Sequence, residues 1–195
     1  MGEGDGKLTM LYAQVHLTLP PWVHQLDLEG RLYADDDARI ALAIELARHN
    51  VERRTGGPFG AALFNGAGRL LGVGVNRVIE QNCSVAHAEM MAFMCAQGRL
   101  ARHRLNEDGM RVVLATSTQP CCQCYGATFW AGVDELLIGA RSEDVMRLTA
   151  FDEGPLPADW IGELQRRGIT VRRDLRRDEA CAVLAAYAAA AGATY

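Results

Sequence analysis

Two short stretches of the 195-residue chain combine side chains that bind metal ions with side chains that move protons. Residues 86–89 read Ala-His-Ala-Glu, and residues 120–124 read Pro-Cys-Cys-Gln-Cys. Cys121 and Cys124 are three positions apart, so on a helix both thiols lie on one face and can share an ion. One imidazole and two thiolates fill three of the four positions around zinc and leave the fourth for water. The two stretches therefore predict one Zn²⁺ per subunit, bound by His87, Cys121 and Cys124.

Glu89 is predicted to move protons rather than to bind the metal. His87 and Glu89 are two positions apart and would point to opposite sides of a regular helix. Both can serve one site only if the helix meets that site through its first turn, and the sequence places them at a helix start. Glu89 would then lie beside the metal and take a proton from the water that the zinc ion activates.

The two stretches are more informative together than apart. Cys-x-x-Cys alone fits either a redox or a metal site, and a zinc ribbon would need a second Cys-x-x-Cys, which the sequence lacks. A thioredoxin-like site would leave His87 and Glu89 without a role. His-x-Glu followed by Pro-Cys-x-x-Cys is the signature of zinc deaminases. The neighbouring Cys122 should face elsewhere on its helix, as a small buried apolar residue.

The composition is that of an ordinary globular protein, with 49% hydrophobic and 23% charged residues. A formal net charge of -4 argues against a protein that coats nucleic acid. The first residues do not resemble a signal peptide, so the six cysteines predict a reducing, cytoplasmic compartment rather than a disulfide framework. The sequence has no uninterrupted apolar run of about 18 residues, and we expect no membrane contact.

The elements that must hold these side chains alternate along the chain. Residues 1–34, interrupted by Pro20-Pro21, are expected to form an extension that packs on a single domain of residues 35–195. A helix is predicted to begin at Asp35 and to end before residues 56–58, which read Gly-Gly-Pro. Strands are predicted over 59–64, 69–78, 111–115, 135–140 and 169–171, and helices over 85–100, 120–131, 143–149, 158–167 and 176–191. This order predicts the α/β class, as a three-layer α/β/α sandwich with a five-stranded mixed sheet.

With these residues the chain resembles the cytidine deaminase-like superfamily of zinc deaminases, and within it bacterial guanine deaminase is the most similar branch. The likeness runs from about Asp35 to Glu153. The resemblance implies the layered fold just described, a zinc cofactor and a homodimer. It also implies hydrolytic deamination of a free nucleobase, guanine to xanthine and ammonia, by a zinc-activated hydroxide, with the base and water as the partners.

The resemblance also implies a set of pocket residues. Phe59, in the segment Gly-Pro-Phe-Gly-Ala, would wall the base pocket, and the side-chain amide of Asn76 would hydrogen-bond the base. Ala88 would offer main-chain contacts, and Trp130 would stack on a purine. Glu153, in the segment Phe-Asp-Glu, would be a second catalytic acid that helps to protonate the leaving amine.

The sequence also departs from the pattern, and other functions stay open. Gln119 stands where many relatives have a glutamate before Pro-Cys. The substrate could be another amino-substituted ring, such as cytosine, an aminopyrimidine or an aminotriazine. A tRNA adenosine deaminase would need a basic surface, but the arginine pairs at 166–167, 172–173 and 176–177 are interleaved with acidic residues, so we expect no nucleic-acid partner. A zinc-stabilised binding protein without activity would have no need of Glu89.

Overall fold

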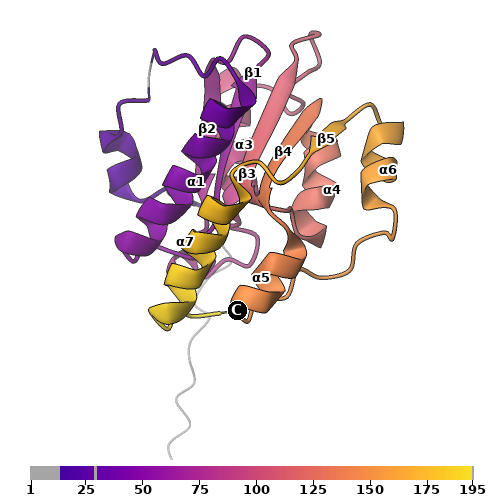
Figure 1. Ribbon diagram of the computed structural model, residues 1–195. Coiled ribbons are helices and arrows are strands. Elements are labelled where there is room, and N and C mark those ends of the chain that lie inside the picture. Colours follow the sequence, from indigo (N-terminus) through magenta and orange to yellow (C-terminus); the bar gives the residue numbers. More distant parts are fainter. Residues whose placement is uncertain (1–13, 29, 195) are drawn as a thin grey trace, which may run out of the picture.

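The structure is a computed structural model that describes residues 14–28 and 30–194, and its centre is a five-stranded mixed sheet with helices on both faces (Figure 1). The strands are β1 (Gly60–Asn65), β2 (Leu70–Val75), β3 (Val112–Thr118), β4 (Glu135–Ala140) and β5 (Thr170–Arg172). Their order across the sheet is β2-β1-β3-β4-β5. β1 runs antiparallel to β2 and β3, whereas β3, β4 and β5 are parallel. The predicted fold class is confirmed.

Helices cover both faces of this sheet. They are the 3₁₀ helix η1 (Pro21–Gln25) and the α-helices α1 (Asp36–Glu52), α2 (Val78–Gln81), α3 (Ala88–Leu100), α4 (Cys122–Ala131), α5 (Ser142–Leu148), α6 (Trp160–Arg166) and α7 (Arg177–Ala189). One buried apolar cluster lies between the sheet and α1 with α7, and a second lies between the sheet and α3. Both faces of β3 and β4 are therefore buried, as in other sheets that carry parallel strands. No helix of the described residues is long and apolar enough to cross a membrane.

Local sequence explains where α1 begins and how the first hairpin turns. The Asp35 side chain caps α1 by accepting a hydrogen bond of 2.8 Å from the main-chain N–H of Ala38. The turn between β1 and β2 needs glycine at position 68, because φ there is +80° and an added Cβ would lie 2.2 Å from the main-chain oxygen of Tyr33. In the N-terminal segment, Trp22 and Val23 are buried in the same cluster as α1.

Several predicted boundaries are wrong by a few residues. The helix predicted from Val85 begins at Ala88, and the one predicted from Pro120 begins at Cys122. The strand predicted to end at Ala115 continues to Thr118, because a polar Thr-Ser-Thr run is buried there against neighbouring strands and helices. The short helix α2 was not predicted. Pro21 starts a 3₁₀ helix instead of interrupting regular structure, since proline lacks only an N–H that a helix start leaves unpaired.

Candidate active site

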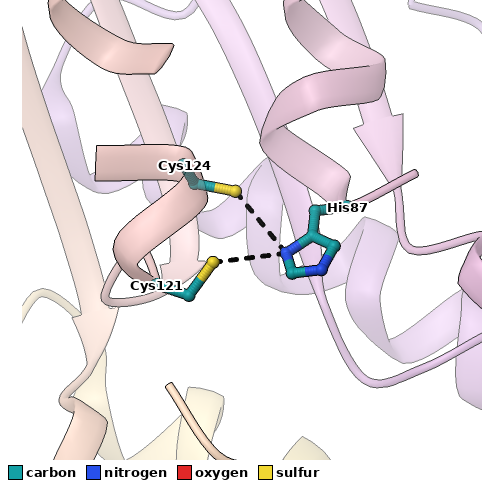
Figure 2. A group of neighbouring side chains, drawn as sticks. All are labelled: His87, Cys121 and Cys124. Atoms are coloured by element: carbon teal, nitrogen blue, oxygen red, sulfur yellow. Dashed lines mark hydrogen bonds between the residues drawn. The ribbon is translucent and has the colours of Figure 1, made fainter. Parts of the chain in front are cut away.

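The three predicted metal ligands come from the N-terminal ends of two neighbouring helices (Figure 2). His87 is the N-cap of α3, and Cys121 is the N-cap of α4, which follows the carboxyl end of β3. Cys124 lies one turn into α4 and is buried. Helix N-termini carry partial positive charge, which favours thiolate over thiol, the form that binds a metal ion. The fold therefore supplies thiolate-forming positions next to an imidazole.

The donor atoms have the separations that a zinc ion requires. His87 Nδ1 lies 3.4 Å from Cys121 Sγ and 3.6 Å from Cys124 Sγ (Figure 2). All three donor atoms lie within 4.8 Å of one another. A tetrahedral zinc ion with Zn–N of about 2.0 Å and Zn–S of about 2.3 Å separates nitrogen and sulfur ligands by about 3.5 Å. The residues present thus fit zinc in both donor type and spacing.

The pKa values of the two ligand thiols shift in opposite directions. The hydrogen bond from Cys124, with a smaller contribution from His87, lowers the pKa of Cys121 to about 4. The same contact raises the pKa of Cys124, because Cys124 is the thiol that keeps the proton. Ligation of Cys124 to zinc would replace this proton with the metal ion, since the thiolate is the ligand form.

Glu89 lies beside the ligands but is held by other partners. It is buried in the first turn of α3, where Oε1 accepts a hydrogen bond of 3.3 Å from Thr116 Oγ1 and Oε2 accepts one of 3.3 Å from Cys124 Sγ. Burial, with the charge of Cys121 adding to it, raises the pKa of the Glu89 carboxyl. The carboxyl group thus sits within reach of the metal site, oriented by a threonine hydroxyl from β3.

Glu153 approaches the same site from a loop that follows α5. Its main-chain oxygen accepts a hydrogen bond of 3.0 Å from the N–H of Cys122, which pins the loop to the start of α4. Gly154 allows this approach because φ is +67° and an added Cβ would lie 2.6 Å from Cys122 Sγ. Burial, with smaller contributions from the charges of Cys121 and Glu89, raises the pKa of the Glu153 carboxyl to about 8. A carboxyl group with that pKa carries a proton near neutral pH.

Four of the five residues assigned from the resemblance lie around one cavity with the ligands His87 and Cys121. Those four are Phe59, Asn76, Ala88 and Glu153. Asn76 is 1% exposed, and its Oδ1 accepts hydrogen bonds of 3.4 Å from the main-chain N–H groups of Gly57 and Val78. The side-chain amide is therefore held in one orientation at the wall of the cavity.

A comparison with known families identifies the chain. Residues 34–140 match the family described as the cytidine and deoxycytidylate deaminase zinc-binding region. The chain belongs to this deaminase family. The match begins just before α1 and includes all three zinc ligands and Glu89.

Solved structures and curated proteins extend this finding. The deaminase is 44% identical to the guanine deaminase from Nitrosomonas europaea, with a TM-score of 0.86 over 92% of this chain and 99% of that one. A variant of the protein NE0047 in complex with 8-azaguanine is 45% identical, with a TM-score of 0.86 over 91% of this chain and 98% of that one. The guanine deaminase of Bacillus subtilis (strain 168) is 33% identical over 111 residues, which are 57% of this chain and 67% of that protein.

The deaminase is a zinc-dependent aminohydrolase. When bound by His87, Cys121 and Cys124, zinc supplies a Lewis acid that makes a water molecule nucleophilic near neutral pH. The protein surrounds this position with two carboxyl groups in different settings. Glu89 receives hydrogen bonds from Thr116 and Cys124, and Glu153 lies buried on the loop after α5.

Two residues of the deaminase lie where the sequence did not place them. Trp130 is 74% exposed near the end of α4 and does not line the cavity, so the single chain does not bring it to the base pocket. Cys122 is exposed and not buried as expected, because it occupies the first turn of α4 beside the loop at Gly154.

Three further residues line the cavity without a role predicted from the sequence, namely Thr118, Phe151 and Asp152. Each lies within three positions of an assigned or ligating residue, so proximity to the motifs could have indicated them. Gln119, noted only as a departure from the pattern, lines the cavity as well.

Proposed function

We propose that this deaminase hydrolyses free guanine to xanthine and ammonia. The observation that carries the proposal is a single cavity in which a fixed side-chain amide, Asn76, and two buried carboxyl groups, Glu89 and Glu153, surround the metal ligands. The similarity over nearly its whole length to a guanine deaminase supports this choice of base. A side-chain amide offers a donor and an acceptor, which suits the mixed edge of a purine.

Two aromatic side chains line the cavity and suit a planar base. The rings of Phe59 and Phe151 meet edge to face, with centroids 5.0 Å apart, and both residues line the cavity. Asn76 would hydrogen-bond the edge of the base, and the main chain of Ala88 would add a contact. Because Asn76 is held in one orientation by hydrogen bonds, the base meets a group that is already positioned.

Two proton transfers are assigned to the two carboxyl groups. Glu89 takes a proton from the attacking water and delivers it to a ring nitrogen, and the Thr116 hydroxyl orients it. Glu153 gives a proton to the leaving amine, which departs as ammonia, and takes one back from the new hydroxyl group on C2 as the carbonyl forms. The net reaction converts guanine and water into xanthine and ammonia. Two carboxyl groups in different settings allow one to act as base and the other as acid.

The experiment is turnover by zinc-loaded protein across a panel of bases. We expect guanine to yield equal amounts of ammonia and xanthine, measured by an ammonia assay and by chromatography. Hypoxanthine, which has no exocyclic amine, is the matched control and should yield neither. If guanine yields no ammonia but cytosine, an aminopyrimidine or an aminotriazine does, that other ring is the substrate in place of guanine. If ammonia is released only from a tRNA anticodon loop, the protein is an RNA-editing deaminase.

The charge distribution supports a small-molecule substrate without a nucleic-acid partner. Five of the six arginines in the C-terminal pairs form ion pairs, with Asp36, Asp37, Asp144, Asp159, Asp174, Glu163 and Glu179. The remaining one, Arg173, lies over the ring of Trp160. Such a neutralised surface has little charge to offer a phosphate backbone. Weak binding of tRNA in a gel shift, without salt dependence, is the expected result.

We also propose a cytoplasmic homodimer. Six free cysteines suit a reducing compartment. On α4, the exposed ring of Trp130 lies beside the partly buried ring of Phe129, and a large exposed aromatic side chain of this kind suits a subunit interface. Light scattering should give twice the chain mass, and Trp130→Glu should give the monomer; a wild-type monomer at micromolar concentration would overturn the dimer.

A further inference from the structure

The side chain of Gln119 is polar and largely buried. It is 4% exposed and lines the cavity together with Asn76, Glu89 and Glu153. Throughout residues 14–28 and 30–194, no group hydrogen-bonds its carboxamide. Its amide atoms are not among the fully enclosed unpaired atoms of the described residues, so they are open to the cavity, where a polar group of the ligand can hydrogen-bond them.

The backbone at Gln119 is fixed by its neighbours. Its main-chain N–H donates a hydrogen bond of 2.8 Å to the oxygen of Ala140, one step beyond the pairing of Thr118 with Ala140 in the sheet. Pro120 follows directly, and the residue before a proline is confined to extended conformations. The side chain therefore starts from a rigid position between the end of β3 and the zinc ligand Cys121.

The chemistry of the cavity gives this amide a distinct task. Glu89 and Glu153 are carboxyl groups, which suit the N–H groups of a base and the proton transfers of the reaction. A keto oxygen on the base needs a donor instead, and a carboxylate there would repel it. Gln119 supplies N–H donors without adding negative charge to a cavity that is already lined by three acidic residues, Glu89, Asp152 and Glu153, and by Cys121.

We propose that Gln119 is a specificity-determining residue that donates a hydrogen bond to the 6-keto oxygen of the bound purine. This inference rests on the proposed function, because it takes guanine as the substrate. Guanine and 2,6-diaminopurine carry the same 2-amino group but differ at position 6, where one has an acceptor and the other a donor. The side chain at 119 then sets the preference between them.

The test is competition between these two bases in one reaction. With equal concentrations, the ratio of xanthine to isoguanine formed equals the ratio of the two kcat/KM values. For Gln119→Glu we expect this ratio to fall at least about tenfold from the wild-type value, because a lost hydrogen bond and a new repulsion act on guanine alone. A general loss of activity from the added charge cancels in the ratio.

Gln123→Glu is the matched control. Gln123 is another amide near the start of α4, with a buried Nε2 that lacks a partner, but it does not line the cavity. It should leave the product ratio at the wild-type value. If Gln119→Glu shows no turnover, Gln119→Leu decides the matter: we expect the KM for guanine to rise at least about fivefold, with the zinc content unchanged.

The outcomes separate this inference from the proposed function. If the wild-type protein makes no xanthine, the proposal that guanine is the substrate is wrong. Wild-type protein that makes xanthine, with a product ratio in Gln119→Glu within twofold of wild type, overturns only the assignment of Gln119.

Discussion

The ring of Tyr187 in α7 stacks on the ring of Phe151, with centroids 5.9 Å apart and an interplanar angle of 21°. Phe151 in turn meets Phe59, and Glu153 follows two positions later on the same loop. The loop is thus held between a C-terminal helix and Phe59 at the wall of the cavity. α7, which carries no deaminase motif, helps to hold the second carboxyl group in place.

Tyr187→Ala should therefore reduce catalysis as well as stability. We expect the free energy of unfolding to fall by about 3 kcal/mol, the range for removing a buried aromatic ring, and kcat to fall because the loop with Glu153 loses its support. Urea unfolding and steady-state kinetics on guanine measure the two effects. Tyr187→Phe keeps the stacked ring and loses only the hydrogen bond to Ala193, so it should restore kcat. Equal loss of kcat in both variants would show that the ring contact is not what matters.

Glu89→Gln should separate metal binding from turnover. The amide keeps the size of the side chain but cannot accept and release a proton, so kcat should fall by about 10²–10⁴-fold. Zinc content, measured by atomic emission, should stay at one ion per chain because Glu89 is outside the ligand set. Substantial activity in this variant would remove Glu89 from the role of proton carrier.

Cys124→Ser and Cys122→Ser form a matched pair in one helix. Cys124 is buried within the ligand set, so its loss should reduce zinc content and abolish turnover. Cys122 is exposed and is not part of the ligand set, so its replacement should leave both at the wild-type level. Treatment with a strong chelator should reproduce the first phenotype, and added zinc should reverse it. Full zinc content in Cys124→Ser would contradict the assigned site.

Gly74→Ala should displace the helix that carries His87 and Glu89. An added Cβ at this position in β2 would lie 2.0 Å from the main-chain oxygen of Ala88 and 2.4 Å from the N of Ala92. The backbone of α3 must move away, and we expect a loss of about 1–3 kcal/mol in stability together with weaker zinc binding. Gly98→Ala is the control, because nothing lies within 4 Å of its added Cβ, and it should stabilise the helix by about 0.5–1 kcal/mol.

The ion pair between Asp144 and Arg177 should make the free energy of unfolding depend on pH in the acidic range. Asp144 in α5 accepts hydrogen bonds of 2.7 and 2.9 Å from Arg177 in α7, and these contacts hold the pKa of Asp144 far below its usual range. A carboxyl group with a lowered folded-state pKa stabilises the protein above its unfolded pKa of about 3.9 and loses that effect as the pH falls towards the folded value.

Asp144→Asn should thus reduce the free energy of unfolding by about 3 kcal/mol at pH 7, and the difference from wild type should shrink below about pH 4. Urea unfolding across this pH range measures it. Asp178→Asn, at an exposed position on α7 next to Arg177, should change stability by less than about 1 kcal/mol. A difference for Asp144→Asn that is constant with pH would contradict the ion pair as its cause.

The sequence by itself determined the local chemistry of the metal site. The spacing of Cys121 and Cys124 requires one face of one helix, and the presence of His87 two residues before Glu89 requires a helix start. Both requirements follow from helix geometry over a few residues, so no distant contact was needed to infer them. The alternation of strands and helices likewise indicated the layered fold, because hydrophobic patterns are local.

Tertiary structure decided which of the remaining residues meet. Asn76, Gln119 and Glu153 come from separate parts of the chain and line one cavity only because β2, β3 and the loop after α5 end at the same place. Trp130, in contrast, follows the ligands closely in sequence yet lies on the outer surface. Distance along the chain says little about such contacts, because they depend on how whole elements pack and on which backbone positions, such as Gly74, permit close approach.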